Sequence, residues 1–192
     1  MTGMARRQLP VLWLMTDPER GDGLAALDAL PPGAGIVFRH YDVPGRAALA
    51  RDWRDRAKAC GLVFLVAGDP RLAAAVKADG FHAPEALIHR TSTVRRLMPW
   101  AIVTAAAHGV PGLVAAARAG VDAVLVSPVF ATRSHPGARP LGAVRFAALA
   151  RATTVPVIAL GGMNAATFPR LAGTAAAGFA AIDAFRSPAK IP

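Results

Sequence analysis

The sequence predicts one (β/α)8 barrel of the TIM type, and three observations favour this fold. Short β-branched or apolar runs alternate with Ala/Leu/Arg segments of helical period, which is typical of parallel strands joined by crossover helices. Eight strand segments occur within the 192 residues. The seventh ends in the pair Gly161-Gly162, where phosphate sites recur in this fold. The expected strands cover residues 11–15, 35–40, 62–66, 80–82, 101–104, 123–126, 155–160 and 179–182.

The segments between these strands predict the helices of a minimal barrel. Residues 186–192 follow the last strand and are too short and too proline-rich for an eighth helix, which is therefore expected to be missing or truncated. The exposed flank would need a cover, either residues 1–8 or a partner subunit in a homodimer. No second domain is expected within residues 1–192. The expected helices cover 23–30, 46–59, 71–78, a mixed segment through 94–98, 111–119, 143–150 and 165–171.

Composition narrows the class of partner. The net charge of +10 favours an anionic partner, and phosphorylated metabolites are one such class. No dense basic run with interleaved aromatic residues is present, so we expect no nucleic-acid partner. No apolar segment is long enough to span a bilayer, and the single Cys60 provides no disulfide framework. These features predict a protein of the reducing cytoplasm with no membrane partner.

The second strand carries the first candidate binding residue. Alternation places Val37, Arg39 and Tyr41 on one face and Phe38 and His40 on the other. If the first face points inward, Arg39 enters the barrel mouth, where barrel enzymes bind their substrates. A structural ion-pair role for Arg39 is an equally weighted interpretation.

Histidines and a long loop supply further candidates at the same rim. His40, His82, His108 and His135 fall at or just beyond expected strand ends, where imidazole can transfer protons or bind anions. Each of them could equally be a packing residue. The loop over 127–142 carries hydroxyl, imidazole and guanidinium groups suited to an anion, among them Thr132 and Ser134.

The glycine pair after the seventh strand is the candidate phosphate site. Gly161 and Gly162 permit close approach of backbone N–H groups to a ligand. A helix opening at Asn164 would add the positive end of its dipole.

Several segments together resemble the thiamine phosphate synthase and thiazole tautomerase superfamily. The resemblance covers nearly the whole chain and implies a barrel that holds a thiazole phosphate, with its phosphate on the turns after strands seven and eight. The most specific motifs are Pro-Val-Phe-x-Thr at 128–132 and Val-Pro-Val-Ile-Ala-Leu-Gly-Gly at 155–162. The others are residues 14–17, 78–82 and 106–108.

The synthase branch of that family implies Mg²⁺ held by aspartates after strands three and four. Here Ala67-Gly68 stands where the family has Asn-Asp, and only the neighbouring Asp69 could substitute. Residues 83–87, directly after His82, contain no aspartate, and strand two offers Val37 and Tyr41 for the family's glutamine and lysine. Asp183 in strand eight would repel a phosphate dianion.

The departures favour a tautomerase-like enzyme of thiamine biosynthesis that needs no cofactor. The resemblance gives His108 the role of catalytic proton carrier, and Arg39, His82, Thr132 and Ser134 are the expected substrate-binding residues. Two alternatives stay open. One is a synthase, a transferase that uses Mg²⁺ with Asp69. The other is a non-catalytic barrel that binds a ligand or partner.

Overall fold

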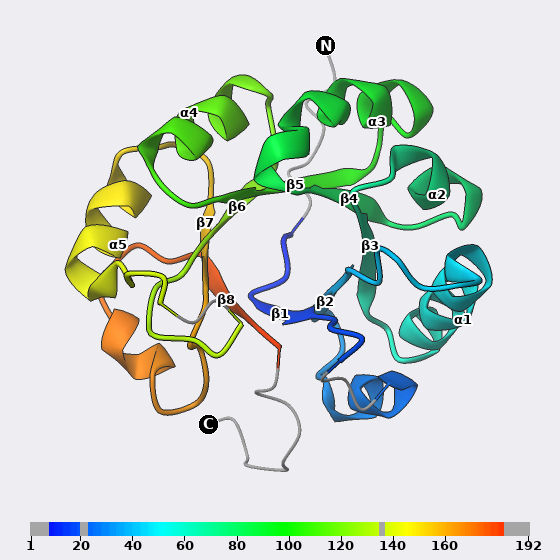
Figure 1. Ribbon diagram of the computed structural model, residues 1–192, viewed down its shortest axis with the longest axis horizontal. Coiled ribbons are helices and arrows are strands. Elements are labelled where there is room, and N and C mark those ends of the chain that lie inside the picture. Colours follow the sequence, from blue (N-terminus) through cyan, green and yellow to red (C-terminus); the bar gives the residue numbers. More distant parts are fainter. Residues whose placement is uncertain (1–7, 20–22, 135–136, 183–192) are drawn as a thin grey trace.

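The computed structural model describes residues 8–19, 23–134 and 137–182 and shows a closed barrel of eight parallel strands. Each strand pairs with the next, and β8 closes the ring on β1 through Leu12↔Phe179, Trp13↔Ala180 and Leu14↔Ala181. The predicted fold is therefore confirmed. Figure 1 shows the ring of strands face-on, with the helices on its outside. The strands are β1 (Leu12–Met15), β2 (Gly35–Phe38), β3 (Val63–Ala67), β4 (Gly80–Ala83), β5 (Ile102–Ala107), β6 (Ala123–Val126), β7 (Val157–Leu160) and β8 (Gly178–Ala181).

Alternate residues of the strands build two separate cores. One set points into the barrel, and the other packs beneath the helices. Val37 belongs to the interior cluster and Phe38 to the outer one, as the alternation of strand two predicts. Trp13, fully buried, is the largest interior side chain. The barrel is therefore a packed core, and a ligand can only bind at its end.

Helices surround this ring, although two of the expected ones are replaced by short 3-10 segments (Figure 1). After β1 the chain forms η1, and after β7 it forms only η3, because Pro169 lacks the N–H group that a continuing α-helix needs. The expectation of α-helices over 23–30 and 165–171 was thus wrong. The segments are η1 (Gly23–Ala29), α1 (Arg46–Ala59), α2 (Pro70–Ala75), η2 (Glu85–Arg90), α3 (Thr91–Leu97), α4 (Val110–Arg118), α5 (Gly142–Arg151) and η3 (Phe168–Leu171).

Some boundaries differ from the expected ones for identifiable reasons. Helix α2 ends early, since Lys77 adopts a left-handed backbone with φ 55°. Strand β2 ends at Phe38 because the N–H of Arg39 donates to Thr16 Oγ1 at 2.8 Å. Strand β5 continues three residues beyond the expected Thr104, through pairing of residues 105–107 with β6.

Residues 183–192 lie outside the described part of the chain. The expectations of a missing eighth helix and of a repulsive Asp183 therefore stay predictions, as does the homodimer. Within the described part, the helices are too short or too polar to cross a membrane.

Candidate functional site

A cavity of about 600 Å³ opens at the carboxyl ends of β6, β7 and β8, with Arg39 reaching it from the end of β2. This is the end of the barrel at which enzymes of this fold place their chemistry. Five residues proposed from the sequence line it: Arg39, Thr132, Ser134, Gly161 and Gly162. The other lining residues are Ser127, Pro128, Phe130, Ala131, Arg133, Leu160, Met163, Asn164, Thr167, Arg170, Ala180, Ala181 and Ile182.

The turn at Gly161 and Gly162 forms one wall of this cavity. Gly161 and Gly162 have φ values of 91° and 64°, in the left-handed region that favours glycine. The turn packs against the loop after β6, since Phe130 N–H donates to the Gly161 carbonyl at 3.0 Å. Within the described residues the amides of Gly162 and Met163 have no protein acceptor, so both are available to an anionic ligand.

The segment after this turn differs from the expected helix terminus. The Asn164 Oδ1 atom accepts the amides of Ala166 and Thr167 at 2.9 and 3.0 Å. The Asn164 amide itself donates to Thr167 Oγ1 at 2.9 Å. These donors are therefore satisfied within the turn, and the expected α-helix dipole at Asn164 is absent.

Arg39 forms the structural ion pair that the sequence left open, and it also lines the cavity. Its Nε donates to the Thr16 carbonyl at 2.9 Å, and its Nη2 lies 3.8 Å from Asp17 Oδ2. The guanidinium group is thus held by the residues that follow β1 while it lines the cavity. A held guanidinium loses little rotamer freedom on binding, which suits the recognition of a carboxylate or phosphate.

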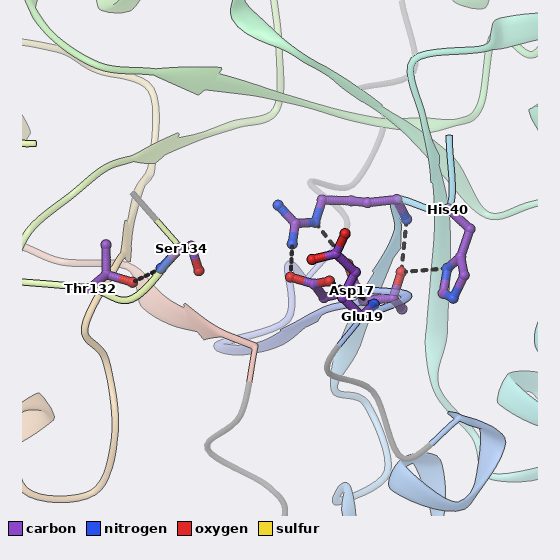
Figure 2. A network of polar contacts seen from close by, with 7 residues as sticks. Asp17, Glu19, His40, Thr132 and Ser134 are labelled. Atoms are coloured by element: carbon purple, nitrogen blue, oxygen red, sulfur yellow. Dashed lines mark hydrogen bonds and ion pairs between the residues drawn. The ribbon is translucent and has the colours of Figure 1, made fainter. Parts of the chain in front are cut away.

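The loop after β6 brings the hydroxyls of Thr132 and Ser134 to the cavity. Thr132 Oγ1 accepts the Ser134 amide at 3.3 Å, and both residues line the cavity. Figure 2 shows Thr132 and Ser134 together, apart from Asp17, Glu19 and His40 near the ends of β1 and β2. His135 lies outside the described residues.

His108 lies beside the cavity and does not line it. Its Nδ1 is 3.0 Å from the Ser127 carbonyl oxygen, and its amide donates to Glu85 Oε2 at 2.8 Å. A carbonyl oxygen can only accept, so Nδ1 carries the proton and Nε2 is the basic nitrogen of the neutral ring. Nε2 lies 3.9 Å from Glu85 Oε2. Ser127, which positions the ring, does line the cavity.

Two other histidines proposed at strand ends are buried and lie away from the cavity. His82 is 3% exposed with Nδ1 2.9 Å from Thr104 Oγ1, and burial, reinforced by the charge of Arg39, lowers its pKa to about 3. It is therefore neutral at physiological pH. Burial also lowers the pKa of His40, which stacks on Phe38 in the outer core.

The end of β3 does not provide a magnesium site. Asp69 is the N-cap of α2, and its Oδ1 accepts the amides of Arg71 and Leu72 at 2.9 and 3.0 Å. In addition, Arg46 and Arg90 donate to the carbonyl oxygens of Ala67 and Gly68 at 2.7 and 2.8 Å. Mg²⁺ needs several oxygen ligands, and the described residues contain no cluster of three His, Cys, Asp or Glu side chains. The residues present do not fit this metal.

Sequence reasoning missed Arg170 and Thr167 as cavity residues. It placed both inside a helix, whose faces could not be assigned without knowing how the chain leaves β7. The signal that was available is Pro169, which argues against a regular helix at this point.

Sequence comparison with known proteins identifies the family of this chain. A family model described as thiamine monophosphate synthase matches residues 17–185. The chain belongs to this family. "Putative thiamine-phosphate synthase 2" of Aquifex aeolicus is 34% identical over 163 residues, covering 82% of this chain and 87% of that protein. A thiamine-phosphate synthase of Laribacter hongkongensis is 31% identical over 187 residues, covering 90% and 86%.

A solved structure supports the same architecture. The thiamine phosphate pyrophosphorylase of Pyrococcus furiosus superposes with a TM-score of 0.79, covering 97% of this chain and 95% of that one. At 20% identity this similarity concerns the fold alone. Thiamine biosynthesis is thus the metabolic setting of the family to which this barrel belongs.

Proposed function

We propose that the cavity binds a phosphorylated thiazole and that the enzyme moves a proton on it without a metal, as a tautomerase does. The phosphate would lie on the amides of Gly162 and Met163, and Arg39 would bind the carboxylate of the same ligand. Support for two anion positions comes from the cavity lining, in which Arg39 follows β2 and the glycine turn follows β7. Thr132 and Ser134 add hydroxyl donors to the same cavity.

The orientation of His108 carries the chemical part of the proposal. Its Nδ1–H is donated to the Ser127 carbonyl, which leaves Nε2 as the base. The thiazole must extend from the cavity past Ser127 to reach this nitrogen, because His108 lies beside the cavity. A proton would then leave one position of the thiazole, be held on Nε2 and return at another position, so no co-reactant is required. The Glu85 carboxylate, 3.9 Å from Nε2, would stabilise the imidazolium formed between these steps. His82 would act as a neutral packing residue beneath this site.

Metal dependence tests the proposal directly. Conversion of a thiazole carboxylate phosphate is followed by NMR with and without a chelator, and we expect the same rate in both samples. A rate that collapses on chelation would rule out the metal-free mechanism. Purified protein is also titrated with thiazole phosphates and with unrelated sugar phosphates. Binding of thiazole phosphates alone would establish the ligand class.

A Mg²⁺-dependent synthase is the second candidate, and the names of the relatives favour it. Incubation with a thiazole phosphate, a pyrimidine pyrophosphate and Mg²⁺ distinguishes the two reactions. We expect no thiamine phosphate; its formation would establish the synthase and make Asp69 the first metal ligand to test. If neither reaction nor any binding is detected, the non-catalytic barrel is the remaining interpretation. The cytoplasmic location stays a prediction.

A further inference from the structure

The cavity contains a cation on the 3-10 segment after β7 that the family resemblance does not assign. Arg170 lies in η3 and lines the cavity, with its guanidinium carbon 4.6 Å from the ring centroid of Phe130. Phe130 lines the same cavity from the loop after β6. A guanidinium group stacked on an aromatic face keeps its N–H donors in its own plane, where they can bind a ligand.

Arg170 has no carboxylate partner within the described part of the chain. Among the described residues, the surrounding cavity lining contains hydroxyls, glycines and other arginines and no acidic side chain. A positive charge that faces a cavity without a protein counter-ion favours an anionic ligand there.

The backbone after β7 indicates why the positive charge of Arg170 matters for phosphate binding. In barrels of this fold a phosphate is often held by the turns after strands seven and eight together with the N-terminus of a short helix, whose amides and dipole face it. Here Asn164 and Thr167 satisfy the amides that would open such a helix. Within the described residues no α-helix follows β7, and the amides of Gly162 and Met163 are the donors after this strand that remain for a phosphate.

We propose that Arg170 replaces the missing helix dipole as the phosphate-binding cation of this cavity and selects phosphorylated over unphosphorylated ligands. The inference rests on the proposed function, because it places the phosphate at the glycine turn. Arg170 contacts the ligand directly, and Phe130 holds its guanidinium group in position.

Ligand binding by Arg170→Met tests this role. Isothermal titration is performed with a thiazole phosphate and with the corresponding thiazole alcohol. We expect the affinity for the phosphate to fall by about tenfold to a hundredfold, as for loss of a hydrogen bond to a charged group, with unchanged affinity for the alcohol. Arg170→Lys keeps the charge but loses the planar guanidinium group. Its affinity for the phosphate should lie between that of the unsubstituted protein and that of Arg170→Met.

Arg145→Met is the matched control, because Arg145 is an exposed arginine of α5 outside the cavity. It removes the same net charge and should bind the phosphate as the unsubstituted protein does. If Arg170→Met also binds the phosphate with unchanged affinity, the role of Arg170 is overturned while the thiazole site stands. If the unsubstituted protein binds no thiazole phosphate, both proposals are overturned.

Discussion

A Cβ atom built on Gly161 would lie 2.8 Å from the Cα atom of Pro128, a separation that real Cβ contacts essentially never show. Gly161 also has φ 91°, so an alanine there would be strained even in open space. The turn after β7 and the loop after β6 are thus fitted to each other through their backbones. This fit defines one wall of the candidate phosphate site.

The Gly161→Ala variant should therefore lose both stability and ligand binding. We expect the free energy of unfolding to fall by about 2–5 kcal/mol, from the left-handed conformation together with overpacking against Pro128. Urea unfolding measures this change. Gly120→Ala is the control, because Gly120 has φ 65° with no atom near the added Cβ. It should cost only about 1–2 kcal/mol, and equal losses in the two variants would mean that the contact with Pro128 is unimportant.

His108→Ala tests the proposed base. Because the proposed phosphate and carboxylate contacts are made by the glycine turn and Arg39, ligand affinity should change little, whereas the tautomerisation rate should fall by about 10²–10⁴-fold. Rates are followed by NMR, and affinity by titration. His89→Ala is the control, since His89 is exposed on η2 away from the cavity. Full activity of His108→Ala would remove the mechanism even if binding survived.

The barrel interior offers a test of its packing that is independent of function. A Cβ on Gly35 would lie 2.2 Å from the Trp13 ring, so Gly35→Ala must displace that ring. We expect a loss of about 1–3 kcal/mol in the unsubstituted background and a smaller loss when Trp13 is already leucine. Urea unfolding of the four proteins in this double-mutant cycle measures the coupling. Additive losses would contradict the contact.

The fold could be predicted because its signal is repeated along the chain. Strand 123–126 and helix 46–59 were predicted to the residue, since each has a clear apolar pattern. The extension of β5 through residues 105–107 could not be predicted from the sequence. Three alanines have no strand preference of their own, and they are held in the strand by pairing with β6.

The site was predicted in part, for a related reason. Gly161, Gly162 and Thr132 belong to motifs, Ser134 lies in the long loop after β6, and all four line the cavity. Arg170 belongs to no motif, and its position depends on where the chain leaves β7. His82 shows the converse: although it is at a strand end, its ring faces the barrel interior and forms a hydrogen bond with Thr104, so its proposed substrate-binding role stays a prediction.

The shifted pKa of the buried His82 predicts how the free energy of unfolding depends on pH. Its pKa is about 3 in the folded protein and near 6.5 when unfolded, mainly because burial disfavours the charged ring. Between these values the unfolded chain binds more protons, so stability is lost as the pH falls from 6.5 towards 3. Between pH 7 and pH 5 this amounts to about 2 kcal/mol. His82→Asn, which keeps a polar partner for Thr104, should lose this part of the pH dependence. Urea unfolding at both pH values measures it, with exposed His89→Asn as control. An unchanged difference between pH 7 and pH 5 in His82→Asn would show that another group causes the acid sensitivity.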